Sequence, residues 1–374
     1  MGVRGSGGNS NSSGGIIPSY KQKRSWKQLV LGKAVPGTGT SRESPAGDAA
    51  VSDRHFIGNG ARLFEALIAS SGGNTNPIRM FSATELMAAT DDYNPERFLG
   101  EGIWKVYGGV HDGRPIAVKR AFTRFFVTPD LILNMFLNEV VSLSQINHRN
   151  VVRLLGCCIE TRAPILVYEL VSGGVTLHQR IHSADASSRI PWADRLRIAI
   201  EVANAINYLH TSLRVPIVHG MIISKNIFLD GCCCAKVGAF GYSELVFKEV
   251  VQGSSGRSGS RVNAKLSSDS HLGLHVTEKD DVYDFGMLVI ELLTGKMPTE
   301  KYEGGSRYMH LEYFVSSARG NLLGSVLDAS ILSETDWEQL MACAYVALRC
   351  VTEDVEGRPT MKESVQELRR IRGY

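Results

Sequence analysis

Residue types that can do chemistry recur at regular spacings in the first half of the chain. A glycine-containing run, Leu99-Gly100-Glu101-Gly102, is followed by Val106, and Lys119 comes about twenty residues after the run begins. Glu139 lies twenty residues beyond Lys119, in a segment with helical periodicity. Taken singly, a lysine in a strand or a glutamate in a helix is usually a solvated surface residue. The joint spacing of these residues instead indicates that they belong to one functional site.

The elements that must position these residues change character along the chain. From Phe98 to Val171 the pattern predicts short strands, interrupted by a single helix. The strands are expected at 106–107, 116–118, 151–155 and 165–168, and the helix at 129–145. After Ser172 helices dominate, over 192–211, 280–294, 308–318, 335–351 and 360–371. The expected fold class is therefore α+β and bilobal, with a small strand-rich lobe and a larger helical lobe.

Three regions are expected along the chain. Residues 1–60 are rich in Gly and Ser, which predicts a disordered tail. Residues 61–96 form a helical extension, in which Ser82-Ala-Thr-Glu85 is a capping box for a short helix ending near Thr90. Residues 97–374 form the main domain, with lobes at 97–171 and 172–374. Within it, the serine-rich stretch 253–275 is expected to be a flexible surface loop.

Composition and charge limit the class of protein. The chain has 374 residues, 43% of them apolar, which is enough to build a large core and excludes disorder of the whole chain. The net charge of +3 hides an asymmetry, because residues 1–42 carry seven basic residues and no acid. No apolar stretch is long enough to span a bilayer, and none resembles a secretory signal. We therefore expect a protein that is neither secreted nor transmembrane, and that does not bind nucleic acid.

The seven cysteines do not have the spacing of a metal site. They occur as Cys157-Cys158, as Cys232-Cys233-Cys234, and singly at Cys343 and Cys350. Neither a C-x-x-C spacing nor a matching histidine pair is present, so no zinc site is expected. Reduced thiols in a cytosolic protein are the simplest interpretation.

The order of these signals resembles a eukaryotic protein kinase over residues 97–370. The resemblance implies that Gly100, Gly102 and Val106 belong to the glycine-rich loop over the nucleotide phosphates. It implies that Lys119 holds the α- and β-phosphates and that Glu139 pairs with it. Two later segments, Asp281-Val-Tyr-Asp-Phe-Gly286 and Gly357-Arg358-Pro-Thr360, resemble framework motifs of plant receptor-like kinases.

Two departures from the kinase pattern bear on catalysis. Met221 stands where the family has its catalytic aspartate, and Ile223 stands where it has a lysine, although Asn226 is retained. Ala239-Phe240-Gly241 replaces Asp-Phe-Gly, so the principal magnesium ligand is missing. A thioether cannot accept a proton, and a methyl group cannot bind a metal ion. We therefore expect no catalytic residue, no bound magnesium and a pseudokinase.

The nucleotide site is altered as well. The glycine loop is one residue shorter than the family pattern and lacks its third glycine. Trp104 in this loop is expected either to fold over the phosphate site or to pack outward, and weak or absent ATP binding is favoured. The chain also lacks the Ala-Pro-Glu motif, which removes the usual partner of Arg358. Arg358 is therefore expected to pair with another acid or to be exposed.

The framework of the fold is retained. Leu143, Leu154, His219 and Phe240 match the stacked hydrophobic spine of kinases, which is anchored on Asp281. A narrower resemblance covers the extension, including 61–70, 76–86 and 88–93, and points to the plant receptor-like cytoplasmic pseudokinases of the ZED/ZRK group. Residues 136–158 resemble both that group and the wall-associated kinases. What this implies is an adaptor that links an NLR-type immune receptor to receptor-like cytoplasmic kinases.

The N-terminus offers a membrane anchor. Met1-Gly2-Val-Arg-Gly-Ser6 fits the pattern for N-myristoylation of Gly2. Because one acyl chain binds membranes only weakly, the basic residues Lys21, Lys23, Arg24 and Lys27 would supply a second, electrostatic contribution. A solvated tail and an organelle transit peptide are the competing interpretations. The expected location is cytoplasmic, with association at the plasma membrane if Gly2 is acylated.

Three functions remain open on the sequence. The first is a catalytically inactive kinase fold that acts as an adaptor in plant immune signalling. The second is a low-activity Ser/Thr kinase that uses Lys119, Glu139 and Asn226 with unusual metal binding. The third is a switch that binds ATP without transferring phosphate.

Overall fold

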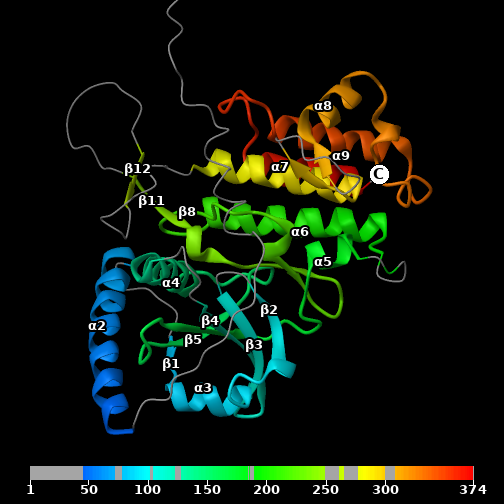
Figure 1. Ribbon diagram of the computed structural model, residues 1–374. Helices are drawn as coiled ribbons and strands as arrows, with labels where there is room; N and C mark the ends of the chain where they lie inside the picture. Colours follow the sequence, from blue (N-terminus) through cyan, green and yellow to red (C-terminus); the bar gives the residue numbers. More distant parts are fainter. Residues whose placement is uncertain are drawn as a thin grey trace, which may run out of the picture. The chain divides into compact units, whose positions relative to one another are not determined.

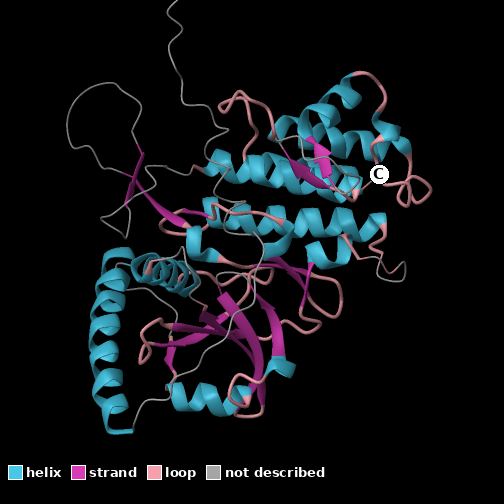
Figure 2. Ribbon diagram, viewed as in Figure 1, coloured by secondary structure: helices cyan, strands magenta, loops and turns pink. Residues whose placement is uncertain are grey.

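The computed structural model describes residues 45–71, 78–101, 104–122, 128–183, 185, 189–248, 261–264, 277–299 and 308–373. All of them belong to one compact unit formed by residues 37–374. Its strand-rich and helical parts are shown in Figures 1 and 2, and they confirm the expected α+β architecture of a small sheet-containing lobe and a larger helical lobe.

The small lobe is built on a six-stranded sheet with the order β1-β5-β6-β4-β3-β2. Its strands are β1 (Arg79–Met80), β2 (Phe98–Glu101), β3 (Trp104–His111), β4 (Arg114–Ala121), β5 (Leu154–Cys158) and β6 (Ile165–Glu169). Asp112 and Gly113 join β3 to β4 with φ of 50° and 72°, the backbone of a tight hairpin turn that matches strand twist. The long helix between β4 and β5, α4 (Pro129–Ser144), is capped by Thr128 and has Pro129 in its first turn.

The large lobe is mainly helical. Its helices are α5 (Leu177–Ile181), α6 (Trp192–Thr211), α7 (Glu278–Thr294), α8 (Leu311–Arg319), α9 (Trp337–Cys350) and α10 (Met361–Arg372). Short strands lie beside them: β7 (Val175–Thr176), β8 (Ile217–Val218), β9 (Ile227–Leu229), β10 (Ala235–Val237), β11 (Glu244–Lys248), β12 (Arg261–Ala264), β13 (Met297–Thr299) and β14 (Tyr308–His310). The long helices confirm the predicted segments to within a few residues at each end.

Several predicted strands have other bounds. Strand β3 spans Trp104–His111 rather than 106–107, and β4 spans Arg114–Ala121 rather than 116–118. The strand expected at 151–155 starts at Leu154, because Val151 instead bridges Val237 of β10. In the serine-rich stretch 253–275, the residues of β12 pair with β11 and so are not simply a loop. The rest of that stretch lies outside the described residues.

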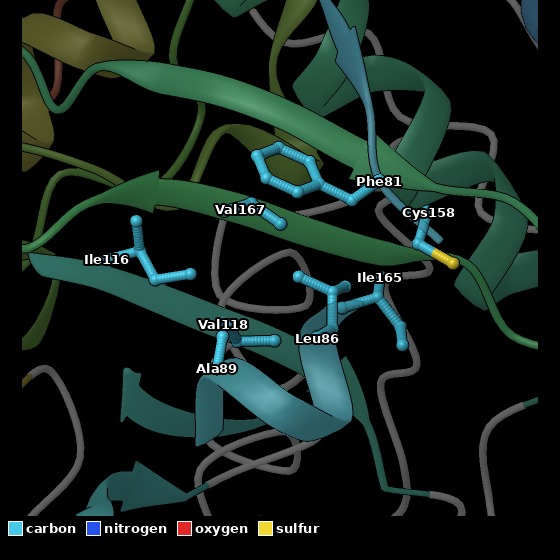
Figure 3. Close-up of a cluster of buried hydrophobic side chains, with 8 residues drawn as sticks. All are labelled: Phe81, Leu86, Ala89, Ile116, Val118, Cys158, Ile165 and Val167. Carbon is cyan, nitrogen blue, oxygen red and sulfur yellow. The ribbon is translucent and has the colours of Figure 1, made fainter. Parts of the chain in front are cut away.

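The N-terminal extension packs on the small lobe. Helix α3 (Ala83–Thr90) begins at the predicted capping box, in which Ser82 and Glu85 each bond the other's backbone amide, and it ends at the predicted Thr90. Leu86 and Ala89 of α3 lie against strand residues in a buried cluster, drawn in Figure 3. The cluster also contains Phe81, Ile116, Val118, Cys158, Ile165 and Val167. The extension is therefore part of the core of this lobe.

Order begins earlier than the sequence predicted. Helix α2 spans Pro45–Ser71, so residues 45–60 are not part of a disordered tail. Gly58 and Gly60 weaken the local helical signal, but the buried Asn59 amide donates to the carbonyls of Ile159 and Thr161, both at 3.0 Å. Tertiary contacts thus hold a helix that local propensity does not predict. Residues 1–44, with Gly2 and the basic cluster, lie outside the described residues.

Within the described residues, no helix is both long and apolar enough to cross a bilayer.

Candidate functional site

The predicted ion pair between Lys119 and Glu139 is present. The Lys119 ammonium lies 2.6 Å from Oε2 of Glu139, joining β4 to α4. Glu139 is only 1% exposed, and its other oxygen accepts a 2.5 Å hydrogen bond from the hydroxyl of Tyr168 on β6. Burial and the neighbouring Glu139 charge raise the pKa of Tyr168 well above its ordinary value, so this hydroxyl remains a donor. Tyr168 was not anticipated from the sequence.

The glycine-rich segment is brought next to Lys119 by strand pairing. Gly100 of β2 pairs with Val106 of β3, and Val106 pairs with Lys119 of β4. These three predicted residues therefore lie side by side across the sheet. Gly102 lies outside the described residues.

Trp104 packs inward, which decides between the two orientations expected for it. Its side chain is 8% exposed, and the Lys119 ammonium lies 5.0 Å from the centre of its ring. Such a cation–π contact is worth about 0.5–2 kcal/mol. Lys119 is thus contacted by a carboxylate and by an indole ring, and its side chain is only 13% exposed.

The second half of the site follows β8. Met221 is 5% exposed, and its amide donates to Nδ1 of His219 at 3.2 Å. The Asn226 amide donates to the Met221 carbonyl at 3.0 Å, which closes the turn between them. Asn226 therefore supports the loop, while the thioether of Met221 offers no acid or base.

Ala239 lies at the start of a short helical turn, η4 (Phe240–Tyr242), and has an unusual backbone. Its φ of 66° and ψ of 58° are in the left-handed region, which costs an L-residue with a Cβ about 1–2 kcal/mol. Two hydrogen bonds tie the residues that follow it to α4. The Asn138 amide donates to the Gly241 carbonyl at 3.2 Å, and the hydroxyls of Ser142 and Ser243 are 2.7 Å apart.

Asp281 at the start of α7 anchors the loop. Its two oxygens accept from the amides of His219 and Gly220, each at 2.8 Å, and Oδ2 lies 2.7 Å from Nε2 of His210. Burial alone would raise the pKa of Asp281, but the bond and charge of His210, the charge of His219 and the Gly220 amide together lower it. The His219 ring contacts Phe240 edge to face at 4.7 Å. Of the other predicted spine residues, Leu143 is buried and Leu154 is half-buried.

Comparison with known proteins agrees with this architecture. Residues 99–368 match the family model for protein tyrosine and serine/threonine kinases. The chain belongs to the protein tyrosine and serine/threonine kinase family. Among curated proteins of Arabidopsis thaliana, it is 38% identical to wall-associated receptor kinase-like 1 over 329 residues, 86% of this chain and 43% of that protein. It is 37% identical to putative wall-associated receptor kinase-like 16 over 326 residues, 85% of this chain and 72% of that protein.

The chain spans less than half the length of most of these relatives. For putative wall-associated receptor kinase-like 13, which is 40% identical over 308 residues, the match covers 80% of this chain and 39% of the relative. The comparisons therefore establish a kinase domain related to wall-associated receptor kinases.

Arg358 of this kinase domain is buried, so the expectation of exposure is wrong. It is 3% exposed, and its guanidinium donates to the carbonyls of Thr352 at 2.9 Å and Lys279 at 3.1 Å. It also lies 4.7 Å from the ring centre of Tyr283. Backbone carbonyls and an aromatic face therefore contribute to stabilising this buried charge, in addition to any acid.

Replacing Ala239 by glycine should stabilise the domain. Glycine adopts the left-handed backbone without steric cost, and this outweighs its larger entropy loss, so we expect Ala239→Gly to raise the unfolding free energy by about 0.5 kcal/mol. Urea unfolding measures this. The matched control is the half-buried Ala121 of β4, where glycine has no such advantage and should cost about 0.5–1 kcal/mol. Equal destabilisation by both changes would contradict the strain at Ala239.

Proposed function

We propose that this kinase domain is a pseudokinase that acts as an adaptor. The proposal rests on one observation: the contacts that build the kinase fold are present, while the two catalytic carboxylates of the family pattern are replaced. Asp281, His219 and the Lys119–Glu139 pair keep their contacts, while Met221 and Ala239 occupy the positions that the family pattern gives to its two catalytic carboxylates. Without those carboxylates the site has no residue at these positions to orient a substrate hydroxyl or to bind magnesium.

We further propose that ATP binding is weak or absent. The Trp104 ring and Glu139 flank the ammonium that would contact the phosphates. A nucleotide would have to displace the ring or bind without Lys119. The intact Lys119–Glu139 pair is nevertheless the observation that favours the second candidate, a switch that binds ATP without transferring phosphate.

Thermal unfolding with and without ATP and magnesium tests this. We expect a shift below about 1 °C for the unaltered chain, because a ligand present below its dissociation constant adds little to the free energy of unfolding. Trp104→Ala should unfold at a lower temperature, but its own midpoint should rise by several degrees on adding nucleotide, since about 2–4 °C corresponds to 1 kcal/mol for a domain of this size class.

The matched control for this experiment is Trp337→Ala, which removes an exposed tryptophan on α9. It should respond to nucleotide as the unaltered chain does. A clear shift in the unaltered chain would overturn weak binding and support the switch. No shift in Trp104→Ala would show that something other than the indole blocks the site.

The partners we propose come from the resemblance to the ZED/ZRK group. They are an NLR-type immune receptor and receptor-like cytoplasmic kinases. The fold suits such a role, because a protein can retain a kinase framework for its surfaces alone. Location in the cytoplasm, with Gly2 acylation as a membrane tether, belongs to the same proposal.

Affinity capture from plant tissue tests the adaptor role. The tagged chain should recover both an NLR-type receptor and a receptor-like cytoplasmic kinase, and removing nucleotide and magnesium with apyrase and EDTA should leave recovery unchanged. Loss of both partners after nucleotide removal would favour the switch. Recovery of neither partner in untreated extracts would contradict the adaptor.

A further inference from the structure

A cluster of metal-ligand side chains lies beside the loop that carries Met221. His178 in α5 and His182 at its C-terminal end are four residues apart, which places them on one face, and their ring centres are 4.6 Å apart. Glu291 of α7 lies opposite them. Its Oε1 is 2.8 Å from Nε2 of His182 and 3.8 Å from Nδ1 of His178. All three ligand atoms lie within 4.8 Å of one another.

The Ser224 hydroxyl is a fourth polar atom in this cluster. The Ser224 hydroxyl donates to Oε1 of Glu291 at 2.7 Å and lies 3.4 Å from Nδ1 of His178. Ser224 begins a short helical turn, η3 (Ser224–Asn226), directly after the Met221 loop. The cluster therefore joins α5, α7 and this loop.

The spacing suits a small tetrahedral ion. Zinc bonds of about 2.0–2.2 Å to nitrogen and oxygen place neighbouring ligand atoms about 3.3 Å apart. The two histidine–glutamate distances, 2.8 and 3.8 Å, lie on either side of this value. The two histidine nitrogens lie within 4.8 Å of each other, so side-chain rotations that bring them closer by up to about 1.5 Å would place all three atoms at bonding distance.

The partial exposure of the cluster also suits a metal. The Glu291 side chain is 7% exposed, whereas those of His178 and His182 are 23% and 17% exposed. This leaves an approach for an ion and for a water molecule as an additional ligand.

We propose that His178, His182 and Glu291 bind one divalent transition-metal ion, zinc being the best match, with Ser224 or water as the fourth ligand. Two histidines and a glutamate are a known zinc ligand set. The ion would take the place of the hydrogen bonds that link these side chains, with each histidine keeping its proton on the ring nitrogen that faces away from the ion. It would fix the Met221 loop to α5 and α7, so its role would be structural.

Thermal unfolding of the full chain with zinc chloride provides the first test. We expect the midpoint to rise by about 5 °C or more when zinc is present at a hundred times its dissociation constant. Isothermal titration calorimetry should give one zinc per chain. The His178→Gln/His182→Gln double variant should lose the shift, while His55→Ala, which changes a histidine of α2 outside the cluster, should keep it.

Zinc binding by the surface cysteines must be distinguished from zinc binding at the histidine–glutamate cluster. Cys232 is exposed and Cys233 and Cys234 are half-buried, so these thiols can also take up zinc. The titration is therefore repeated with all three changed to serine, and the shift should persist. With cobalt replacing zinc, this serine variant should show tetrahedral absorption bands without a sulfur-to-metal charge-transfer band.

Two results would overturn the proposal. One is loss of zinc binding in the serine variant, which would assign the metal to the cysteines. The other is a zinc shift that survives when the double histidine change is made in the serine variant. If that double variant does not fold, the cobalt spectrum of the serine variant still decides, because absence of tetrahedral bands would exclude a nitrogen and oxygen site of this geometry.

Discussion

Incubated with labelled ATP and magnesium, the purified chain should transfer phosphate at or below about 10⁻³ per second. Ordinary kinases turn over at about 1–100 per second. Losing a general base or substrate-positioning group costs about 10²–10⁴ in rate, and losing a preorganised electrostatic contact costs about 10²–10³. Met221 replaces the general base or substrate-positioning group, and Ala239 replaces a group that supplies an electrostatic contact through the metal ion. Even if the two losses are less than multiplicative, little transfer should remain.

Two variants make this measurement specific. Lys119→Arg keeps a cation beside Glu139 but changes how it meets a phosphate, so label that persists in this variant comes from a contaminating kinase. The Met221→Asp/Ala239→Asp variant restores both carboxylates, and any gain in rate should require both. Aspartate tolerates the left-handed backbone at position 239 better than alanine does, so this change should not unfold the chain. Phosphate transfer by the unaltered chain that depends on Lys119 would reject the pseudokinase proposal.

Asp281→Asn should destabilise the domain by about 3–5 kcal/mol. The change removes the charge from a fully buried carboxylate that accepts two backbone amides and pairs with His210. Breaking one partner of a buried ion pair is costly because the other partner is left uncompensated. Urea unfolding of the unaltered and variant chains measures the difference.

The matched control is Asp280→Asn, one residue earlier on α7. Asp280 is half-buried and accepts from Thr277 in the capping box of the helix, so its loss should cost about 1 kcal/mol or less. Similar losses from both substitutions would contradict the anchoring role of Asp281.

The pH dependence of Asp281 has a definite sign. The folded state lowers the pKa of Asp281 below its unfolded value of about 3.9. Its contribution to stability is therefore complete above that value and declines as the pH falls through the lower, folded pKa. The difference in stability between the unaltered chain and Asp281→Asn should accordingly shrink below about pH 4, which urea unfolding at several acidic pH values would reveal.

Local sequence patterns predict the long elements of this fold well. Helices α4, α6, α7, α9 and α10 carry strong apolar periodicity, and α3 begins at a capping box whose two hydrogen bonds involve residues only three apart. Helix α2 was placed too late because distant contacts help to hold it, such as the bonds of Asn59, near its middle, to the carbonyls of Ile159 and Thr161. Strand β1 was missed since two residues carry no periodic signal and their pairing with β5 is a long-range event.

The sequence likewise predicted some residues of the candidate site and missed others. Spacing alone identified Lys119 and Glu139, and the structure brings them into an ion pair. The sequence could not predict whether the Trp104 side chain points inward or outward, because its position depends on the packing around Lys119. The buried environment of Arg358 was also missed, since backbone carbonyls of Thr352 and Lys279 have no signature in the sequence.

The sequence by itself determined that this chain has kinase architecture and that side chains without acid–base chemistry stand at positions 221 and 239. These properties depend on residue type and order. Only the tertiary structure decided that Tyr168 shares Glu139 with Lys119, that Trp104 lies against the Lys119 ammonium, and that Glu291 meets His178 and His182. The reason is that each of these contacts joins different elements of one lobe, and their side chains meet only when that lobe has packed.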